Sequence, residues 1–303
     1  MPHPPAGKRS FAIDGHAHAA PPLAPGLYIV ATPIGHLGDV TLRALATLAA
    51  ADLVACEDTR ITARLTQRYA IAAPLLAYHE HNAARQRPKL LAALADGKAV
   101  ALVSDAGTPL ISDPGYRLVA EAVAAGHAVI PVPGASAVLA ALAGAGLPTD
   151  TFLFAGFLPP RETARRKRLA ALAAIPATLA FYEAPQRLGA ALADMAAVLG
   201  MERRAVVARE LTKTFEEFRR APLAALAAHY ADAAVKGEIV ILVAPPAPAA
   251  APDDAAIDAM LRAALREHGV AEAATLVAGR SGLPRRQLYS RILELQRDAD
   301  DDA

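Results

Sequence analysis

The 303-residue sequence has no tryptophan, few other aromatic residues and a single cysteine. Aromatic residues make up 5% of the chain while 54% of it is hydrophobic, so its core must be aliphatic, as in helices layered on sheets. Cys56 cannot form an internal disulfide, and one cysteine excludes metal sites built on paired cysteines. A reducing compartment is the default for such a chain, and we expect a cytosolic globular protein.

Strong net charge and long apolar runs are also missing. The net charge of +1 predicts no strong field around the molecule, so a polyanionic partner would have to meet a local basic patch. Residues 128–147 carry no charge over roughly the ~20 residues that a bilayer needs, but prolines and glycines interrupt them. We interpret this stretch as a strand, a loop and a core helix, and expect no membrane contact. Residues 1–25 lack the apolar core of an export signal and are expected to form a flexible leader.

Apolar strands alternate with helix-like segments from residue 26 to residue 147, which predicts an N-terminal α/β domain with a parallel sheet. Residues 148–244 repeat the pattern with two strands close together, which indicates a second α/β domain with a mixed sheet. Alanines and prolines in residues 245–254 are typical of a stiff linker. Residues 255–303 then predict a small helical extension resembling a helix-turn-helix bundle.

Four loops after apolar strands concentrate glycine and polar residues: Thr32–Asp39, Cys56–Arg60, Ser104–Gly115 and Val132–Ala137. Open α/β sheets bind ligands beyond the carboxyl ends of their strands, so these loops are the expected site. None has the spacing of a phosphate-binding or dinucleotide-binding loop. Acidic acceptors and close-approach glycines suit S-adenosylmethionine better, although each loop taken singly is also ordinary turn material.

The strings "VATPIGHLGD", "CEDTR", "SDAGTPLISDPG", "VPGASA", "FYEAPQRL" and "ARELTKTFEEF" resemble those of the tetrapyrrole-methylase superfamily, and within it the ribosomal small-subunit methyltransferase I family. The resemblance spans about Gly26 to Val243. It implies methylation of the ribose 2′-hydroxyl of a cytidine in 16S rRNA with S-adenosylmethionine, and a cytosolic homodimer. Relatives acting on tetrapyrroles carry a Gly-x-Gly-Pro-Gly-Asp-like first loop, which is absent here, so RNA is the favoured substrate.

The resemblance also implies cofactor contacts from both domains. They fall on Pro33, Asp105, Ala106, Gly107, Pro109, Asp113, Gly134, Ala135, Ser136, Phe181, Tyr182 and Glu238.

Methyl transfer to a weakly acidic ribose hydroxyl requires alignment of the reacting atoms and can gain from a general base. The candidate bases are Glu57, Asp58, Glu80 and Glu210, with Arg60 and Lys213 as partners for the ribose or a neighbouring phosphate. For Asp58, capping of the following helix explains the residue equally well. The sequence "YHEHN" offers two histidines but no third ligand, so no metal site is predicted.

Two basic stretches are candidate RNA contacts. They contribute Arg161, Arg165, Arg166, Lys167 and Arg168 in the second domain, and Arg285 and Arg286 in the terminal bundle. Their phosphate contacts would make RNA affinity salt-dependent, although such runs are often only solvated helix faces. No sequence feature supports sequence-specific DNA binding. Alternatives are a tetrapyrrole or diphthine methyltransferase of the same fold, and a non-catalytic RNA-binding ribosome-assembly factor.

Overall fold

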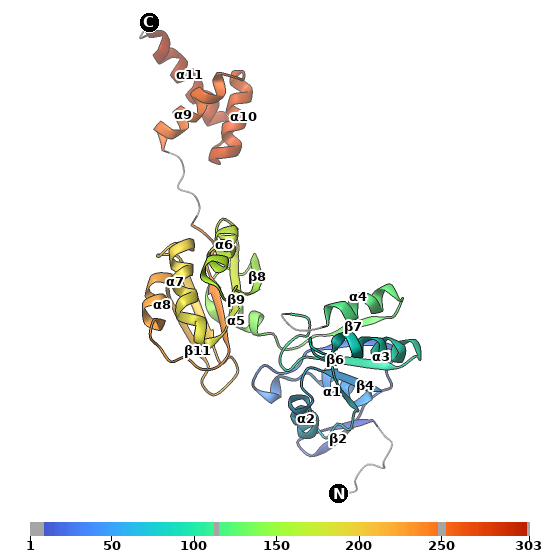
Figure 1. The fold of residues 1–303 in the computed structure, drawn as a ribbon. Helices are drawn as coiled ribbons and strands as arrows, with labels where there is room; N and C mark the ends of the chain where they lie inside the picture. Colours follow the sequence, from blue (N-terminus) through green and yellow to red (C-terminus); the bar gives the residue numbers. More distant parts are fainter. Residues whose placement is uncertain (1–8, 112–114, 248–252, 302–303) are drawn as a thin grey trace. The chain divides into compact units, whose positions relative to one another are not determined.

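The computed structural model describes residues 9–111, 115–247 and 253–301. The chain divides into two compact units, residues 1–246 and 247–303, and the division falls within the predicted linker. The larger unit contains two five-stranded sheets, and the smaller one is helical (Figure 1).

The first described segment differs from the expected flexible leader. Strands β1 (Ser10–Ile13) and β2 (His16–Ala19) form an antiparallel hairpin. Asp14 and Gly15 at its turn both have positive φ, 48° and 81°, which is the conformation that an Asp-Gly turn favours. Phe11 is buried, and the Ala12 amide donates to the Tyr69 carbonyl at 2.7 Å. The prediction of a loose leader is therefore wrong here, because one apolar anchor and a turn dipeptide are enough to dock the hairpin.

The N-terminal sheet is parallel throughout, as predicted, with strand order β5-β4-β6-β3-β7. Its strands are β3 (Gly26–Val30), β4 (Leu53–Cys56), β5 (Leu75–Ala77), β6 (Ala99–Val103) and β7 (Val129–Val132). The two central strands β3 and β6 are buried at every position, which explains their uninterrupted apolar sequences.

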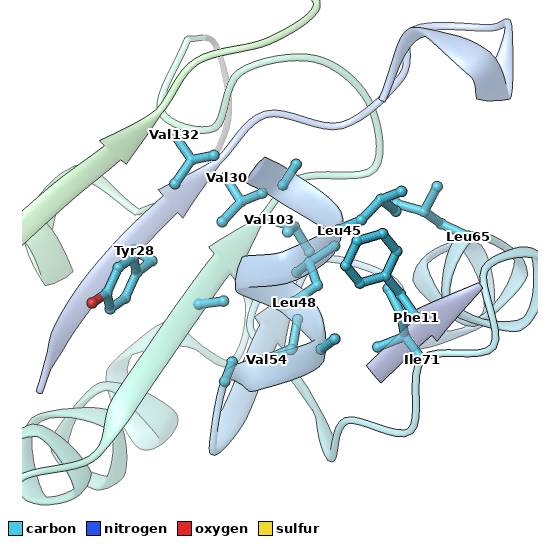
Figure 2. Close-up of a cluster of buried hydrophobic side chains, with 14 of the residues drawn as sticks. Phe11, Tyr28, Val30, Leu45, Leu48, Val54, Leu65, Ile71, Val103 and Val132 are labelled. Carbon is cyan, nitrogen blue, oxygen red and sulfur yellow. The ribbon is translucent and has the colours of Figure 1, made fainter. Parts of the chain in front are cut away.

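Helices cover both faces of this sheet. They are η1 (Leu37–Asp39), α1 (Leu42–Ala50), α2 (Thr59–Arg68), α3 (Ala83–Ala95) and α4 (Tyr116–Ala124). On one face Leu45 and Leu48 of α1 pack with Phe11 of the hairpin and with Val54 and Val103 of the sheet (Figure 2). On the other face α3 and α4 pack through leucines and alanines, in a mostly aliphatic cluster that also contains Tyr78.

The second sheet is mixed, as predicted, with order β11-β10-β12-β9-β8. Its strands are β8 (Phe152–Phe157), β9 (Thr178–Glu183), β10 (Arg204–Arg209), β11 (Glu217–Pro222) and β12 (Ile239–Val243). Only β8 and β9 are parallel. Along one side lie α6 (Glu162–Leu172), η2 (Pro185–Arg187), α7 (Leu188–Leu199) and α8 (Leu223–Tyr230). Helices α7 and α8 lie side by side (Figure 1).

Helix α5 (Ala137–Ala145) joins the two halves of the larger unit. Although it follows β7 of the first sheet, it packs on β10, β11 and β12 of the second. Val138 and Leu142 share a buried cluster with Ala180 and Val206. A division at residue 147, as expected from the sequence, therefore does not describe the packing of α5.

The smaller unit consists of α9 (Asp254–Leu265), α10 (Val270–Ser281) and α11 (Arg285–Asp301). Ile257, Leu261, Val277, Leu288 and Ile292 form its buried core. Gly282 ends α10 with φ 73°, a left-handed conformation that glycine adopts without steric cost. The predicted helical extension is thus present, with three helices.

Candidate functional site

Three of the four predicted loops are bound to one another at the carboxyl ends of β3, β6 and β7. Thr32 and Gly107 form an isolated bridge, in which each amide donates to the other residue's carbonyl at 2.9 and 3.0 Å. The Thr108 hydroxyl donates to the Ala135 carbonyl at 3.2 Å. The loops are therefore one connected platform rather than separate turns.

Asp105 attaches the fourth loop to this platform. Its Oδ1 accepts a hydrogen bond from the Asp58 amide at 2.9 Å. Partial burial raises the pKa of Asp105 above its usual range. Asp58 in turn caps α2, because its Oδ1 accepts from the Arg60 amide at 2.8 Å. Asp105 thus holds two loops together, a role that its sequence position alone does not reveal.

A cavity of about 370 Å³, here called the first cavity, opens between this platform and the second sheet. Five predicted cofactor residues line it: Ala106, Gly107, Ser136, Tyr182 and Glu238. Its volume lies within the ~300–1,000 Å³ of small-molecule sites. Gly107 has φ 76°, and a Cβ there would stand 3.3 Å from Ile34 Cγ2, so glycine lets the backbone form the wall.

The other predicted cofactor residues lie elsewhere. Pro33, Asp105, Pro109, Gly134 and Ala135 belong to the platform loops without being among the residues that line the cavity, and Asp113 lies outside the described residues.

The structure corrects the expected cofactor contact of Phe181. Its side chain is fully buried among the helices on the opposite side of β9, in the cluster that contains Leu188 and Leu192. Tyr182 faces the cavity instead, since successive strand residues point to opposite faces. The structure therefore removes the Phe181 side chain from the expected cofactor contacts.

Sequence reasoning missed most of the cavity's apolar wall. Ile34, Ile111, Phe157, Leu211 and Val240 all line it. They come from five different segments, and no short motif brings them together. A periodic sequence pattern could identify Val240 as buried but not as cavity-lining.

Glu183 is a second missed residue, although it lies inside the quoted "FYEAPQRL" string. It is buried, lines the first cavity and pairs with Arg187 at 2.5 Å. Its Oε1 also accepts from the Ala184 amide at 2.8 Å. A carboxylate paired in this way holds the segment after β9 in place.

The candidate catalytic residues do not converge on the first cavity: none of the six is among the described residues that line it. Glu57 is partly buried, and Glu80 is exposed. Arg60 contacts Asp58 at 2.6 Å, and its hydrogen bonds lower the pKa of Asp58 to about 2. A carboxylate so acidic is a weak base at neutral pH.

Glu210 and Lys213 form a network with Glu238. Lys213 Nζ lies 2.9 Å from Glu210 Oε1 and 3.1 Å from Glu238 Oε2. The bond from Lys213 lowers the pKa of Glu210. Partial burial opposes the charge of Lys213, but its hydrogen bonds to the two glutamates outweigh that effect and raise its pKa. The network borders the cavity because Glu238 lines it.

The basic helix α6 is divided between two roles. Arg165 is buried and pairs with Asp194 of α7 at 2.6 Å, so the expectation that it contacts RNA is wrong. Arg166 binds Asp194 and Glu162 while its side chain stays half exposed.

The remaining residues of the run, Arg161, Lys167 and Arg168, are exposed. In the described part of the chain, no carboxylate pairs with any of these three. They are therefore the cations of this run that stay available for an external anion; Arg161 directly precedes α6, and the other two lie within it.

In the smaller unit, Arg285 and Arg286 are exposed at the start of α11. Arg291 instead pairs with Asp258 of α9 at 2.8 Å and with Glu294 at 3.0 Å. Arg291 therefore fastens α11 to α9, whereas the two arginines at the helix start remain open to solvent.

The described residues contain no group of three or more His, Cys, Asp or Glu side chains that could hold a metal ion. Over the same residues, no helix combines the length and apolarity needed to cross a bilayer.

Comparison with family models gives two matches. Residues 26–227 match the model described as Tetrapyrrole (Corrin/Porphyrin) Methylases, and residues 251–296 match the RsmI C-terminal HTH domain.

Curated proteins named Ribosomal RNA small subunit methyltransferase I are similar over almost the whole chain. That of Mesorhizobium japonicum is 57% identical over 278 residues, which cover 91% of this chain and 94% of that protein. That of Erythrobacter litoralis is 54% identical over 281 residues, covering 93% and 99%.

Solved structures share the fold at lower identity. A cobalt precorrin-4 methyltransferase has a TM-score of 0.57 and 20% identity, covering 72% of this chain and 94% of its own. A uroporphyrin-III C-methyltransferase from Thermus thermophilus, complexed with S-adenosyl homocysteine, has a TM-score of 0.52 and 19% identity, covering 72% and 96%.

Proposed function

Because the chain belongs to the ribosomal RNA small subunit methyltransferase I family of tetrapyrrole methylases, we propose that it methylates the ribose 2′-hydroxyl of a cytidine in 16S rRNA with S-adenosylmethionine. The observation that carries the proposal is the first cavity, which lies at the carboxyl ends of a parallel sheet and is closed by a second sheet. The matches of residues 26–227 and of residues 251–296 to the two family models both support the proposal.

The residues of the first cavity fit S-adenosylmethionine. Its apolar wall, including Leu211 and Val240, suits the adenine ring and the aliphatic carbons of the methionine part. The Glu238 carboxylate can accept from ribose hydroxyls or an ammonium group. Ser136 precedes α5 and makes no side-chain cap, so the first amides of that nine-residue helix can receive the cofactor's carboxylate.

The cofactor supplies an activated methyl group on a sulfonium sulfur. The protein's task is to hold the RNA oxygen in line with that group, and positioning of this kind can contribute up to ~7–11 kcal/mol. Among the candidate bases, Arg60 lowers the pKa of Asp58 to about 2 and Lys213 lowers the pKa of Glu210, so both carboxylates are weakened as proton acceptors. Glu57 and Glu80 remain as candidates, with Lys213 and Arg60 as partners for ribose or phosphate.

RNA contacts are assigned to the exposed cations of α6 and to Arg285 and Arg286 of the bundle. A single-stranded or splayed segment is the expected substrate, since a ribose hydroxyl within a paired helix cannot enter a cavity that already holds the cofactor. A homodimer in the cytoplasm completes the proposal.

Methyl transfer to small ribosomal subunits from cells lacking this gene tests the proposal. With radiolabelled S-adenosylmethionine we expect label in 16S rRNA, and mapping should place it on a cytidine 2′-oxygen. Label in tetrapyrrole precursors or in a translation factor, but none in rRNA, would favour the other methyltransferases of this fold. An absence of cofactor binding at millimolar concentration would favour a non-catalytic assembly factor.

Replacement of Gly107 tests the cofactor position separately. Gly107→Ala forces a left-handed alanine, at about 1–2 kcal/mol, into the cavity wall beside Ile34. We expect the dissociation constant of S-adenosylmethionine to rise about 10-fold or more.

Gly97→Ala is the matched control, because Gly97 has a similar φ of 75° and nothing within 4 Å of its added Cβ. It should lose similar stability without losing cofactor affinity. Equal cofactor binding by both variants, measured by calorimetry, would contradict the placement.

A further inference from the structure

A second cavity, of about 840 Å³, lies in the larger unit. Four segments line it: the turn of the β1–β2 hairpin, the stretch from Gly35 to Leu45, the end of α2 at Arg68 and Tyr69, and residues 212–214. Nothing in the proposed chemistry of the cofactor uses this space.

Adjacent residues of the same two segments line the two cavities. Ile34 lines the first cavity and Gly35 the second; likewise Leu211 lines the first and Thr212 the second. Lys213 lines the second cavity and contacts Glu238, which lines the first. An added Cβ on Gly35 would stand 2.5 Å from Lys213 Cγ, so the two segments that continue from the first cavity into the second lie against each other. A chain whose ribose sits at the first cavity therefore has its neighbouring nucleotides next to the second.

The lining of the second cavity suits a polynucleotide better than a small apolar ligand. Arg68 provides a cation that is half exposed, and the exposed side chain of His36 provides a ring. Lys213 also lines the cavity, but its charge is shared with Glu210 and Glu238. Leu37 and Leu42 are exposed apolar residues. The next residue after this lining on the 212–214 loop, Phe215, has 72% of its surface exposed. Cations for phosphates beside rings for unstacked bases are the usual features of single-stranded RNA recognition.

Contacts of the hairpin and of two neighbouring loops fix the walls of the second cavity in place. Besides Phe11 and the bond from the Ala12 amide, Arg9 pairs with Asp52 at 2.5 Å, so the wall carrying Asp14 is fixed to the sheet. The Tyr69 hydroxyl donates to the Leu37 carbonyl at 2.8 Å, which holds the opposite loop. The His36 amide donates to the Thr212 hydroxyl at 3.1 Å.

We propose that the second cavity binds the RNA segment that flanks the methylated nucleotide, with a phosphate at Arg68. The inference rests on the proposed function and adds the place where the substrate strand leaves the cofactor. Within the described residues, Arg68 has one carboxylate partner, Asp14, at 4.0 Å, and its guanidinium lies 5.5 Å from the centre of the Tyr69 ring. A phosphate can therefore compete with Asp14 for the guanidinium.

The test is the KM for small ribosomal subunits of Arg68→Glu enzyme. Because a phosphate contact becomes a repulsion, KM should rise about 10-fold or more, and the slope of log affinity against log salt should fall by about 1. The dissociation constant of S-adenosylmethionine should not change.

Asp14→Asn removes the competing carboxylate and keeps a residue that tolerates φ 48°. Its KM should fall, which a folding defect cannot produce.

Lys98→Glu and Asp96→Asn are matched controls at the opposite edge of the sheet, before β6. Lys98 is 52% exposed against 53% for Arg68, and its carboxylate partner lies at 3.9 Å against 4.0 Å. Both controls should keep the wild-type KM.

If the wild-type enzyme is active and the Arg68→Glu and Lys98→Glu variants have equal KM values, this inference alone is overturned. A change confined to cofactor affinity would also overturn it, because the cavity would then belong to the cofactor site. A wild-type enzyme that transfers no methyl group to small subunits would overturn the proposed function, and this inference with it.

Discussion

The side chain of Asp58 serves helix α2 and its neighbour Arg60. It accepts from the Arg60 amide and from the guanidinium, with the shortest contact at 2.6 Å. Its own amide donates to Asp105, so the residue connects two loops of the platform through the backbone while its carboxylate is engaged elsewhere. This arrangement favours the capping role over a catalytic one.

Asp58→Asn should therefore affect stability more than chemistry. The folded pKa of about 2 is below the ~3.9 of an unfolded aspartate. The stabilisation by the charge is thus fully present above about pH 4 and is lost as pH falls toward 2. Urea unfolding should show a difference between wild type and variant at pH 7 that shrinks below pH 4. Methyl transfer should persist, whereas loss of a general base would cost ~10²–10⁴ in rate.

At the scale of elements, α6 illustrates how a run of basic residues divides between two environments. Arg165 faces α7 and is neutralised by Asp194, while Lys167 and Arg168 face solvent. Because an α-helix has about 3.6 residues per turn, the four consecutive basic residues 165–168 cannot all face the same way.

Two variants separate these roles. Asp194→Ala leaves Arg165 buried without that partner and should lower the free energy of unfolding by about 3–5 kcal/mol. The double variant Lys167→Ala and Arg168→Ala should leave unfolding in urea unchanged but weaken binding to small subunits, with a shallower salt dependence. Unchanged RNA binding by the double variant would restrict α6 to a structural role.

At the scale of the whole molecule, the two compact units have separate cores. The cluster around Leu261 and Ile292 lies entirely within residues 253–301, and the two sheets lie entirely within residues 1–246. Each unit should therefore fold without the other.

Truncation after Pro246 should leave S-adenosylmethionine affinity unchanged and weaken binding to small subunits. Loss of the exposed Arg285 and Arg286 should lower the slope of log affinity against log salt by about 2, one for each phosphate contact. Calorimetry with the cofactor and filter binding with subunits measure the two effects. An unfolded fragment, seen by circular dichroism, would contradict the independence of the larger unit.

Much of the molecule follows from local sequence alone. Alternating apolar strands and capped helices determined the parallel sheet, the mixed sheet and the three terminal helices, because these patterns depend on neighbours within a few residues. The strand-end loops identified the platform from which Gly107 and Ser136 reach the first cavity.

Only the tertiary structure decided which side chains meet. It placed Phe181 in a helical core and Tyr182 at the cavity, buried Arg165 against Asp194, and docked the hairpin through Phe11. It also set α5 on the second sheet. Such contacts join segments far apart in the chain, and a one-residue change of strand position reverses the face that a side chain presents. Local patterns carry no information on these pairings, so the fold itself had to supply them.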